Sequence, residues 1–200
     1  MPRDPLADLL AYSGHELRTP LTSLTLAVEM CADGMLGPLS PLQAETLAGA
    51  AADCARLRRL IDALTDPVLA GDLARVARGA VDVGAALGTA IAVTNDLAAE
   101  RKVTVALQAQ SAAPIWRGDA DRTARLLAHG LGHALARAQR ASTVTVAVTD
   151  SGGQATVVLA WQSPPGAAQG TMELWLCERL ATALGAAVIA SVDRLEIQLG

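Results

Sequence analysis

Phenylalanine is absent from this 200-residue sequence, and aromatic residues of all kinds make up 2% of it. Hydrophobic residues still reach 52%, and much of that share is alanine, so small side chains dominate the apolar content. No uninterrupted apolar run approaches the roughly 20 residues that a membrane-spanning helix needs. The opening MPRDPLADLL also lacks the basic start, apolar stretch and cleavage site of a secretory signal. We therefore expect a cytoplasmic protein with no membrane partner.

Basic clusters and paired cysteines are lacking as well. The net charge is −4, and no block of basic residues is interleaved with aromatic ones, which argues against a nucleic-acid partner. The three cysteines, Cys31, Cys54 and Cys177, are odd in number and widely spaced, so they match no zinc or disulfide framework. They are predicted to be small buried residues in a reducing compartment.

The first third of the chain has the pattern of a helical hairpin, which we assign to residues 1–70. Apolar residues fall on one stripe over 5–32, and DGMLGPLSP then breaks the pattern with two glycines and two prolines. A second helix, predicted over 41–66, has apolar residues at alternating spacings of three and four: Leu47, Ala50, Cys54, Leu57, Ile61 and Leu64. Because a lone hairpin leaves this face exposed, we expect a homodimer that forms a four-helix bundle. The alternative is that the stripe packs on the chain's own second half.

The remaining residues, 71–200, have the pattern of a small α/β sandwich with helices on one face of a mixed sheet. DPVLAGDL, at 66–73, is the expected linker. Helices are predicted over 84–100, 119–138 and 171–184. Strands are predicted at VDV, at KVTVALQAQ, on both sides of the turn DSGGQ, and as a final hairpin within AVIASVDRLEIQL.

One of only three histidines lies five residues before a proline inside the first predicted helix. His15 lies off the apolar stripe and is expected to face water, while Pro20 has no N–H and leaves the Glu16 carbonyl without a helical partner. A neutral imidazole is a nucleophile, Glu16 can orient it or take its proton, and Thr19 is one turn away. The alternative is a surface histidine beside an ordinary helix bend.

The string HELRTPLTSL, residues 15–24, closely resembles the phosphoacceptor box of sensor histidine kinases. The resemblance implies that His15 is the phosphorylated residue and Glu16 the acid/base partner in transfer. It also implies that Thr19 aligns water in phosphatase turnover and that Pro20 is the family's helix bend. The order of elements after residue 70 resembles the ATP-binding domain of the same kinases, so the resemblance covers the whole chain.

The family's asparagine box, which holds magnesium on the nucleotide phosphates, corresponds here to LLAHGLGHALARA. His129 and His133 stand at the matching positions, although magnesium prefers oxygen ligands and imidazole suits softer metals. Histidines at i and i+4 can also chelate a metal, but no third ligand is evident, so no metal site is predicted.

Further nucleotide determinants of the family are missing. Ser163 stands near the position of an aspartate that reads adenine, and the Asp150 that precedes two glycines is placed in a hairpin turn instead. In place of the family's glycine box the chain has GTMELWL, which puts Met172, Glu173 and Trp175 where backbone should approach phosphate. The segment from Ser163 to Gly170 is also too short for the family's lid. We therefore predict a degenerate ATPase domain that binds neither ATP nor a cofactor.

An intact phosphoacceptor box beside a degenerate ATPase domain resembles the dimeric histidine phosphotransferases of bacterial phosphorelays. This resemblance predicts an ATP-independent relay in which His15 passes a phosphoryl group between receiver-domain aspartates, with Mg²⁺ on the partner receiver. The early start of the hairpin leaves no input domain in cis, and an upstream hybrid histidine kinase is a candidate donor. The alternatives are a response-regulator phosphatase, a pseudokinase scaffold and a divergent ATP-dependent histidine kinase.

Receiver domains are expected to dock around the bundle near His15. The exposed contacts predicted on the first helix are Ser13 and Arg18. On the second helix they are Arg56, Arg58 and Arg59, although such a run of charges is usually only a solvated face.

Overall fold

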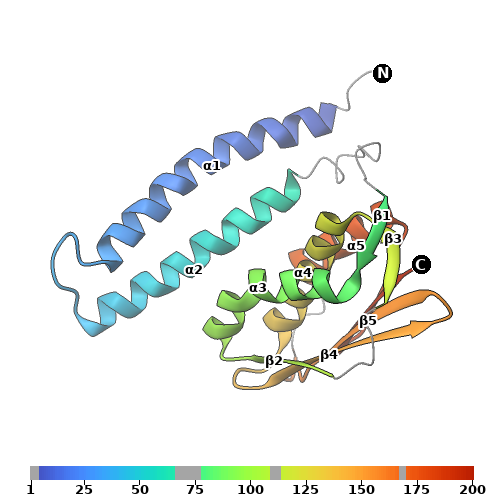
Figure 1. Cartoon of the computed structure of the whole chain (residues 1–200). Helices are drawn as coiled ribbons and strands as arrows, with labels where there is room; N and C mark the ends of the chain where they lie inside the picture. Colours follow the sequence, from blue (N-terminus) through green and yellow to red (C-terminus); the bar gives the residue numbers. More distant parts are fainter. Residues whose placement is uncertain (1–4, 66–77, 109–113, 167–169) are drawn as a thin grey trace. The chain divides into compact units, whose positions relative to one another are not determined.

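The computed structural model describes residues 5–65, 78–108, 114–166 and 170–200. The chain divides into two compact units, Met1–Gly71 and Asp72–Gly200, and each is described by itself. The first is helical and the second mixes helices with strands (Figure 1). The predicted linker at 66–73 lies outside the described residues.

The first unit is the predicted helical hairpin. Helix α1 spans Pro5–Ala32 and α2 spans Pro41–Leu64, and the two run antiparallel (Figure 1). A capping box starts α2: the Ser40 N–H donates to Gln43 Oε1 at 2.8 Å, and the Gln43 N–H donates to Ser40 Oγ at 3.4 Å. Helix α1 continues through Pro20.

The hairpin has a thin core of its own. Leu21, Cys54 and Ile61 form a buried cluster between the helices. Other residues of the expected apolar stripe are exposed to solvent: the exposed fractions are 52% for Leu17 and 59% for Leu24. The stripe is therefore not covered within the hairpin itself.

The second unit contains a mixed five-stranded sheet in the order β2-β4-β5-β7-β6. Strands β2 and β4 are parallel, and the other neighbours are antiparallel. The strands of this sheet are β2 (Thr104–Leu107), β4 (Thr143–Ser151), β5 (Gln154–Ala160), β6 (Ala187–Ala190) and β7 (Arg194–Leu199).

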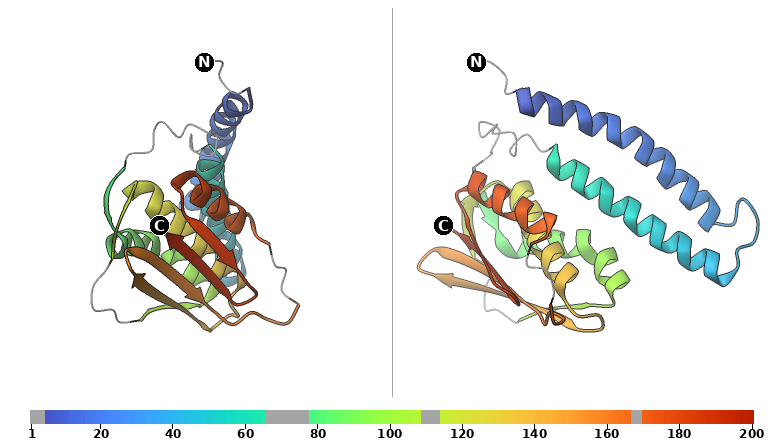
Figure 2. Two further views of the ribbon diagram at one scale, coloured as in Figure 1. Left: turned by 90° about the vertical axis from the view of Figure 1, so that its right-hand side faces the viewer. Right: turned by 180° about the vertical axis from the view of Figure 1, so that it is seen from behind.

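Three helices cover one face of this sheet, as predicted (Figure 2). They are α3 (Val83–Arg101), α4 (Ala120–Arg137) and α5 (Met172–Leu184), and side chains at the N-caps Asp82, Asp119 and Thr171 accept hydrogen bonds from their first turns. The buried side chains of the central strands alternate with open ones, so one sheet face packs against the helices. None of the described helices is long and apolar enough to cross a membrane.

A short strand was missing from the sequence prediction. Strand β3 (Ile115–Gly118) pairs antiparallel with β1 (Gly79–Asp82) in a separate two-stranded sheet. Four residues give too little alternation to reveal a strand, although the buried Trp116 between exposed neighbours fits one. Of the strand predicted at KVTVALQAQ, β2 covers Thr104–Leu107, and residues 109–110 of the prediction lie outside the described residues.

The three cysteines are free thiols. Cys54 and Cys177 are buried, as predicted, and Cys31 is half-buried.

Candidate functional site

His15 lies in the middle of α1 with its side chain exposed, as predicted. Glu16 and Thr19 are exposed on the same helix, and Thr19 Oγ1 donates to the His15 carbonyl at 3.4 Å. An imidazole in this position is open to solvent and accessible to a phosphoryl group presented by another domain or molecule.

Pro20 supplies no N–H, so the Glu16 carbonyl has no helical donor at this turn. Near Pro20, hydroxyl side chains donate hydrogen bonds to backbone carbonyls four residues earlier in the helix. Thr22 Oγ1 donates to the Arg18 carbonyl at 2.8 Å, and Ser23 Oγ donates to the Thr19 carbonyl at 3.4 Å. The backbone next to His15 is thus held partly by side chains.

Arg18, one helical turn from His15 on α1, forms side-chain hydrogen bonds to residues at the end of α2. Its Nε and Nη2 atoms donate to Asp62 Oδ1 at 3.0 and 2.8 Å, and Nη2 also donates to Thr65 Oγ1 at 2.7 Å. Gly14 lets the helices approach here, because a Cβ atom on it would lie 2.1 Å from Thr65 Cγ2. This contact was not predicted, since no local sequence feature indicates Asp62 and Thr65 as partners of Arg18.

Breaking this ion pair is expected to have a small effect. The side chains of Arg18 and Asp62 are 37% and 50% exposed, so Arg18→Ala should lower the free energy of unfolding of the hairpin by at most about 1 kcal/mol. The charge-exchanged double variant Arg18→Asp/Asp62→Arg should recover part of that loss. Urea unfolding of the three proteins measures both effects, and a loss of several kcal/mol would contradict the assignment.

The other residues predicted to dock a receiver lie on the same hairpin. Arg56 and Arg58 are exposed on α2, whereas Ser13 and Arg59 are half-buried. Their role in docking stays a prediction.

The two histidines of α4 both bond to the start of α5. His129 Nδ1 lies 2.5 Å from Glu173 Oε2, and both side chains are 12% exposed. His133 Nδ1 lies 2.8 Å from Thr171 Oγ1, and its ring meets the Trp161 ring edge-on at 5.5 Å between centroids. Glu173 and Thr171 are hydrogen-bond partners of the histidines that the sequence alone did not indicate.

Burial controls the protonation of His133, which is 1% exposed. The pKa of His133 is lowered from 6.5 to about 4: burial is the main cause, the positive charge of Arg137 contributes, and Glu173 opposes the shift. His133 is therefore neutral at pH 7.

Magnesium does not fit these two histidines. Each Nδ1 atom is already hydrogen-bonded to an α5 side chain, and Mg²⁺ prefers oxygen ligands. Among residues 5–65, 78–108, 114–166 and 170–200, no group of three or more His, Cys, Asp or Glu side chains is placed to hold a metal ion.

Ser163 and Asp150 have structural partners. Trp161 Nε1 donates to Ser163 Oγ at 2.9 Å, and the Ser163 N–H donates to Asp193 Oδ1 at 2.9 Å. Asp150 lies near the end of β4, beside the predicted hairpin turn, and its Oδ1 accepts the Gly153 N–H at 3.0 Å.

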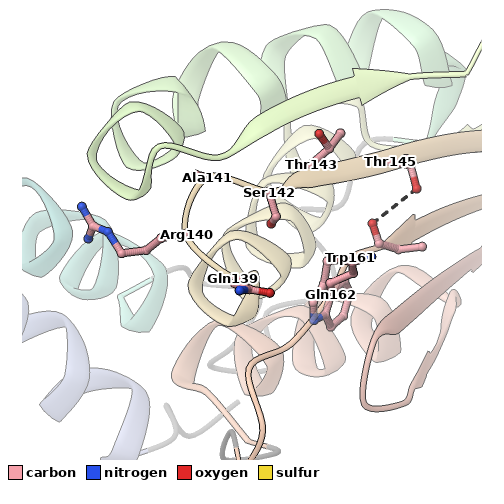
Figure 3. Close-up of a pocket in the computed structure, with 9 residues that line it drawn as sticks. Gln139, Arg140, Ala141, Ser142, Thr143, Thr145, Trp161 and Gln162 are labelled. Carbon is pink, nitrogen blue, oxygen red and sulfur yellow. Dashed lines mark hydrogen bonds between the residues drawn. The ribbon is translucent and has the colours of Figure 1, made fainter.

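A cavity of about 640 Å³ lies where α4 leads into β4 (Figure 3). It is lined by Gln139, Thr143, Thr145 and Trp161 among others, and Thr145 Oγ1 bonds the Ala160 carbonyl at 3.3 Å. Arg140 is the one charged residue among its described lining residues, and its side chain points away from the two threonines (Figure 3). Its described lining residues include hydroxyl groups but no aspartate, glutamate or histidine that could act as a general acid or base beside them.

Residues 6–68 match the family described as the His Kinase A (phospho-acceptor) domain. The sensor histidine kinase GlrK of Escherichia coli (strain K12) is 39% identical over 57 residues, which are 28% of this chain and 12% of GlrK. The sensor histidine kinase QseE of E. coli O157:H7 has the same identity and coverage. The matched segment is thus a small part of these relatives.

Solved structures extend the likeness to the second unit. The histidine kinase AdeS of Acinetobacter baumannii superposes with a TM-score of 0.61 at 16% identity, over 93% of this chain and 97% of that one. Full-length ShkA in complex with AMPPNP gives 0.64 at 19% identity, over 96% of this chain and 45% of that one. At these identities the likeness shows the fold.

These findings overturn the prediction of an ATP-independent phosphotransferase. The matched phospho-acceptor family and both curated relatives point to sensor histidine kinases, and they favour the divergent kinase that was the alternative. The ATP-independent function was predicted because the family's nucleotide-binding residues are missing, even though the phosphoacceptor box HELRTPLTSL is complete. The chain has the fold of a histidine kinase core, a phospho-acceptor hairpin followed by an ATPase-like α/β unit.

Proposed function

We propose that this chain is the core of a divergent sensor histidine kinase, in which His15 accepts the γ-phosphoryl group of ATP and passes it to a response regulator. The observation that carries the proposal is the exposed His15 within HELRTPLTSL, on a hairpin that matches the phospho-acceptor family over residues 6–68.

The chemistry asked of the hairpin is a phosphoryl transfer in two steps. A ring nitrogen of neutral His15 forms a bond to the γ-phosphorus as the bond from that phosphorus to the β,γ-bridging oxygen breaks and ADP leaves. Glu16, the next residue on α1, takes the proton from the other ring nitrogen. In the second step a receiver aspartate oxygen attacks the phosphorus, the N–P bond breaks, and the imidazole is regenerated with its proton.

The ATP-dependent form of this proposal is supported by the fold of the second unit. ShkA, which aligns with 96% of this chain, is described in complex with AMPPNP. The departures at His129, His133, Met172 and Glu173 mean that nucleotide contacts in this chain differ from those of the family. We propose that Mg²⁺ acts on the partner receiver domain, and this rests on the poor fit of the α4 histidines to magnesium.

We further propose that the hairpin works as a homodimer. Leu17, Leu24 and Leu57 are each at least half-exposed in the single chain, and a second hairpin would cover them in a four-helix bundle. Response-regulator receiver domains are the proposed partners, docking beside His15.

Labelling with [γ-³²P]ATP tests the proposed function. The full chain should acquire acid-labile label, and the His15→Gln variant, which removes an exposed side chain and leaves the hairpin core intact, should acquire none. Adding a receiver domain should then move the label to that domain. An unlabelled wild type, beside a known histidine kinase labelled under the same conditions, would contradict ATP-dependent activity, and equal labelling of His15→Gln would place the acceptor elsewhere.

A further inference from the structure

Strand β6 lies at one edge of the five-stranded sheet. In the order β2-β4-β5-β7-β6 its neighbour is β7, and no other strand of the described chain pairs with its outer side. Three of its residues are exposed and Val188 is half-buried, so this edge is open to solvent. The unpaired backbone N–H and C=O groups of an open edge can bind a further strand.

The hydrogen-bond register identifies the backbone groups of β6 that point outward. The Ser191 N–H donates to the Arg194 carbonyl at 2.8 Å, so these residues form a hydrogen-bonded pair at the end of the β6–β7 hairpin. Hydrogen-bonded and non-hydrogen-bonded pairs alternate along an antiparallel ladder. Val188 and Ala190 therefore form non-hydrogen-bonded pairs with β7, and their N–H and C=O groups are directed to the outer side.

The edge lacks the side chains that commonly prevent strands from pairing. Native edge strands are often protected by lysine, by proline or by inward-pointing charges, whereas no charged residue or proline occurs between Gly185 and Val192. Ile189 lies between the two outward-bonding residues and projects from the other face of the sheet, and it is 52% exposed. The edge thus combines free backbone groups with an exposed apolar side chain.

We propose that β6 is a self-association surface, at which the β6 strands of two chains pair antiparallel about a two-fold axis that passes beside Ile189. In this register Val188 of each chain faces Ala190 of the other, and each N–H of these residues donates to a carbonyl across the axis. The two Ile189 side chains face each other and cover their exposed apolar surface. The two sheets would become one continuous sheet.

The chemistry of this edge favours a second copy of the chain as its occupant. Two-fold pairing sets like side chains against each other, so a charged strand would repel its copy and an uncharged one does not. An unrelated peptide would find no ionic group on this strand to recognise. Because the strand is short, we expect weak association. The inference goes beyond the proposed function, since it joins α/β units and requires neither ATP nor the dimer of the hairpins.

Disulfide cross-linking of the full chain tests the pairing. In a Cys31→Ser background, which leaves the buried Cys54 and Cys177 as the native thiols, the variants Ile189→Cys and Val192→Cys are oxidised with glutathione disulfide. Facing residues of a non-hydrogen-bonded pair have Cα atoms about 4.5 Å apart, which a disulfide can span. Ile189→Cys should therefore form linked dimers on the order of tenfold faster than Val192→Cys.

Val192→Cys is the matched control, because Val192 and Ile189 are similarly exposed, at 51% and 52%, and belong to the same hairpin. Val192 lies three residues further from the axis in each chain, so its two copies would be roughly 20 Å apart, too far to be linked. Equal linking rates for the two variants would indicate random encounters and would overturn the proposal.

Proline at position 190 tests the backbone bonds directly. Because the Ala190 N–H points away from β7, Ala190→Pro removes a donor of the proposed contact and no bond of the β6–β7 ladder. Added to Ile189→Cys, it should lower the linking rate to that of Val192→Cys, while tryptophan fluorescence reports that the α/β unit is folded. An undiminished linking rate would contradict the pairing.

Amide exchange provides a second test that needs neither a new thiol nor a proline. The Val188 and Ala190 amides should exchange several-fold more slowly in the wild type than in Ile189→Lys, which sets two like charges against each other at the axis. Equal protection in both proteins would also overturn the contact. None of these measurements uses His15, so absence of labelling by ATP leaves their outcome intact, and absence of pairing leaves the proposed function to its own test.

Discussion

Lowering the pH from 7.5 to 4 is expected to destabilise the wild-type α/β unit by about 3 kcal/mol more than a His133→Asn variant. The group responsible is the buried imidazole of His133, whose pKa is lowered to about 4 in the folded protein. Asparagine keeps a polar atom near the position of Nδ1 for Thr171 but has no proton to gain.

The direction of this pH effect follows from the different pH at which the folded and unfolded states protonate His133. As the pH falls below the ordinary value of 6.5, the unfolded chain protonates His133, whereas the folded chain stays neutral there until about pH 4. The stability due to neutral His133 is therefore fully present above pH 6.5 and is lost progressively between pH 6.5 and 4. Burial is the main cause, and the Arg137 charge adds to it.

Urea unfolding followed by tryptophan fluorescence measures this effect, because all three tryptophans lie in the second unit and Trp161 contacts His133. His15→Asn is the matched control, since it removes an exposed histidine, and its pH profile should follow the wild type. Parallel profiles for the wild type and His133→Asn would show that His133 does not titrate as described.

Replacing Gly14 with valine is expected to destabilise the hairpin by about 2 kcal/mol and to disturb the helix next to His15. A Cβ atom at this position would lie 2.1 Å from Thr65 Cγ2 and 3.3 Å from Thr65 Cβ. Thr65 cannot simply rotate away, because its hydroxyl donates to the Ile61 carbonyl at 2.9 Å and accepts from Arg18 at 2.7 Å.

Two further variants separate this steric effect from helix propensity. Gly49→Val places valine in α2, where a Cβ atom meets nothing within 4 Å, so it reports propensity alone and should leave the stability unchanged or raise it by roughly a few tenths of a kcal/mol. Gly14→Val/Thr65→Ser removes Cγ2 and keeps the hydroxyl, and it should recover part of the loss. The NMR signals of Tyr12, the single tyrosine of the chain, follow hairpin unfolding in each protein. Equal losses in Gly14→Val and Gly49→Val would contradict close packing at Gly14.

The sequence predicted most of the fold because long elements carry strong periodic signals. The hairpin, the three helices of the second unit and the two β-hairpins were placed correctly, since apolar spacing and turn residues such as DSGGQ determine them locally. Strand β3 was missed because four residues carry almost no periodicity.

The contacts around the two sites were less predictable. His15 was recognised from a contiguous string, but the pairing of Arg18 with Asp62 joins residues 44 positions apart. The partners of His129 and His133 are likewise 44 and 38 positions away. Such pairs depend on tertiary packing, which one sequence does not reveal.

The error in function has a related cause. Each departure from the family's nucleotide motifs was counted as a loss, although a substitution can also replace one kind of contact with another. His129 illustrates the point: it was counted as a departure from the asparagine box, yet the fold pairs it with Glu173, which is itself a departure from the glycine box.

Because the hairpin core is small, folding of the helix that carries His15 is expected to depend on protein concentration. Among the hairpin residues whose burial the structure describes, the buried cluster consists of Leu21, Cys54 and Ile61, which is little apolar burial to offset the entropy of ordering two long helices. In the proposed dimer, a second copy adds that burial, so folding of the phosphoacceptor helix and association become one equilibrium governed by mass action. Dilution would then melt the segment that carries His15 while the α/β unit remains folded.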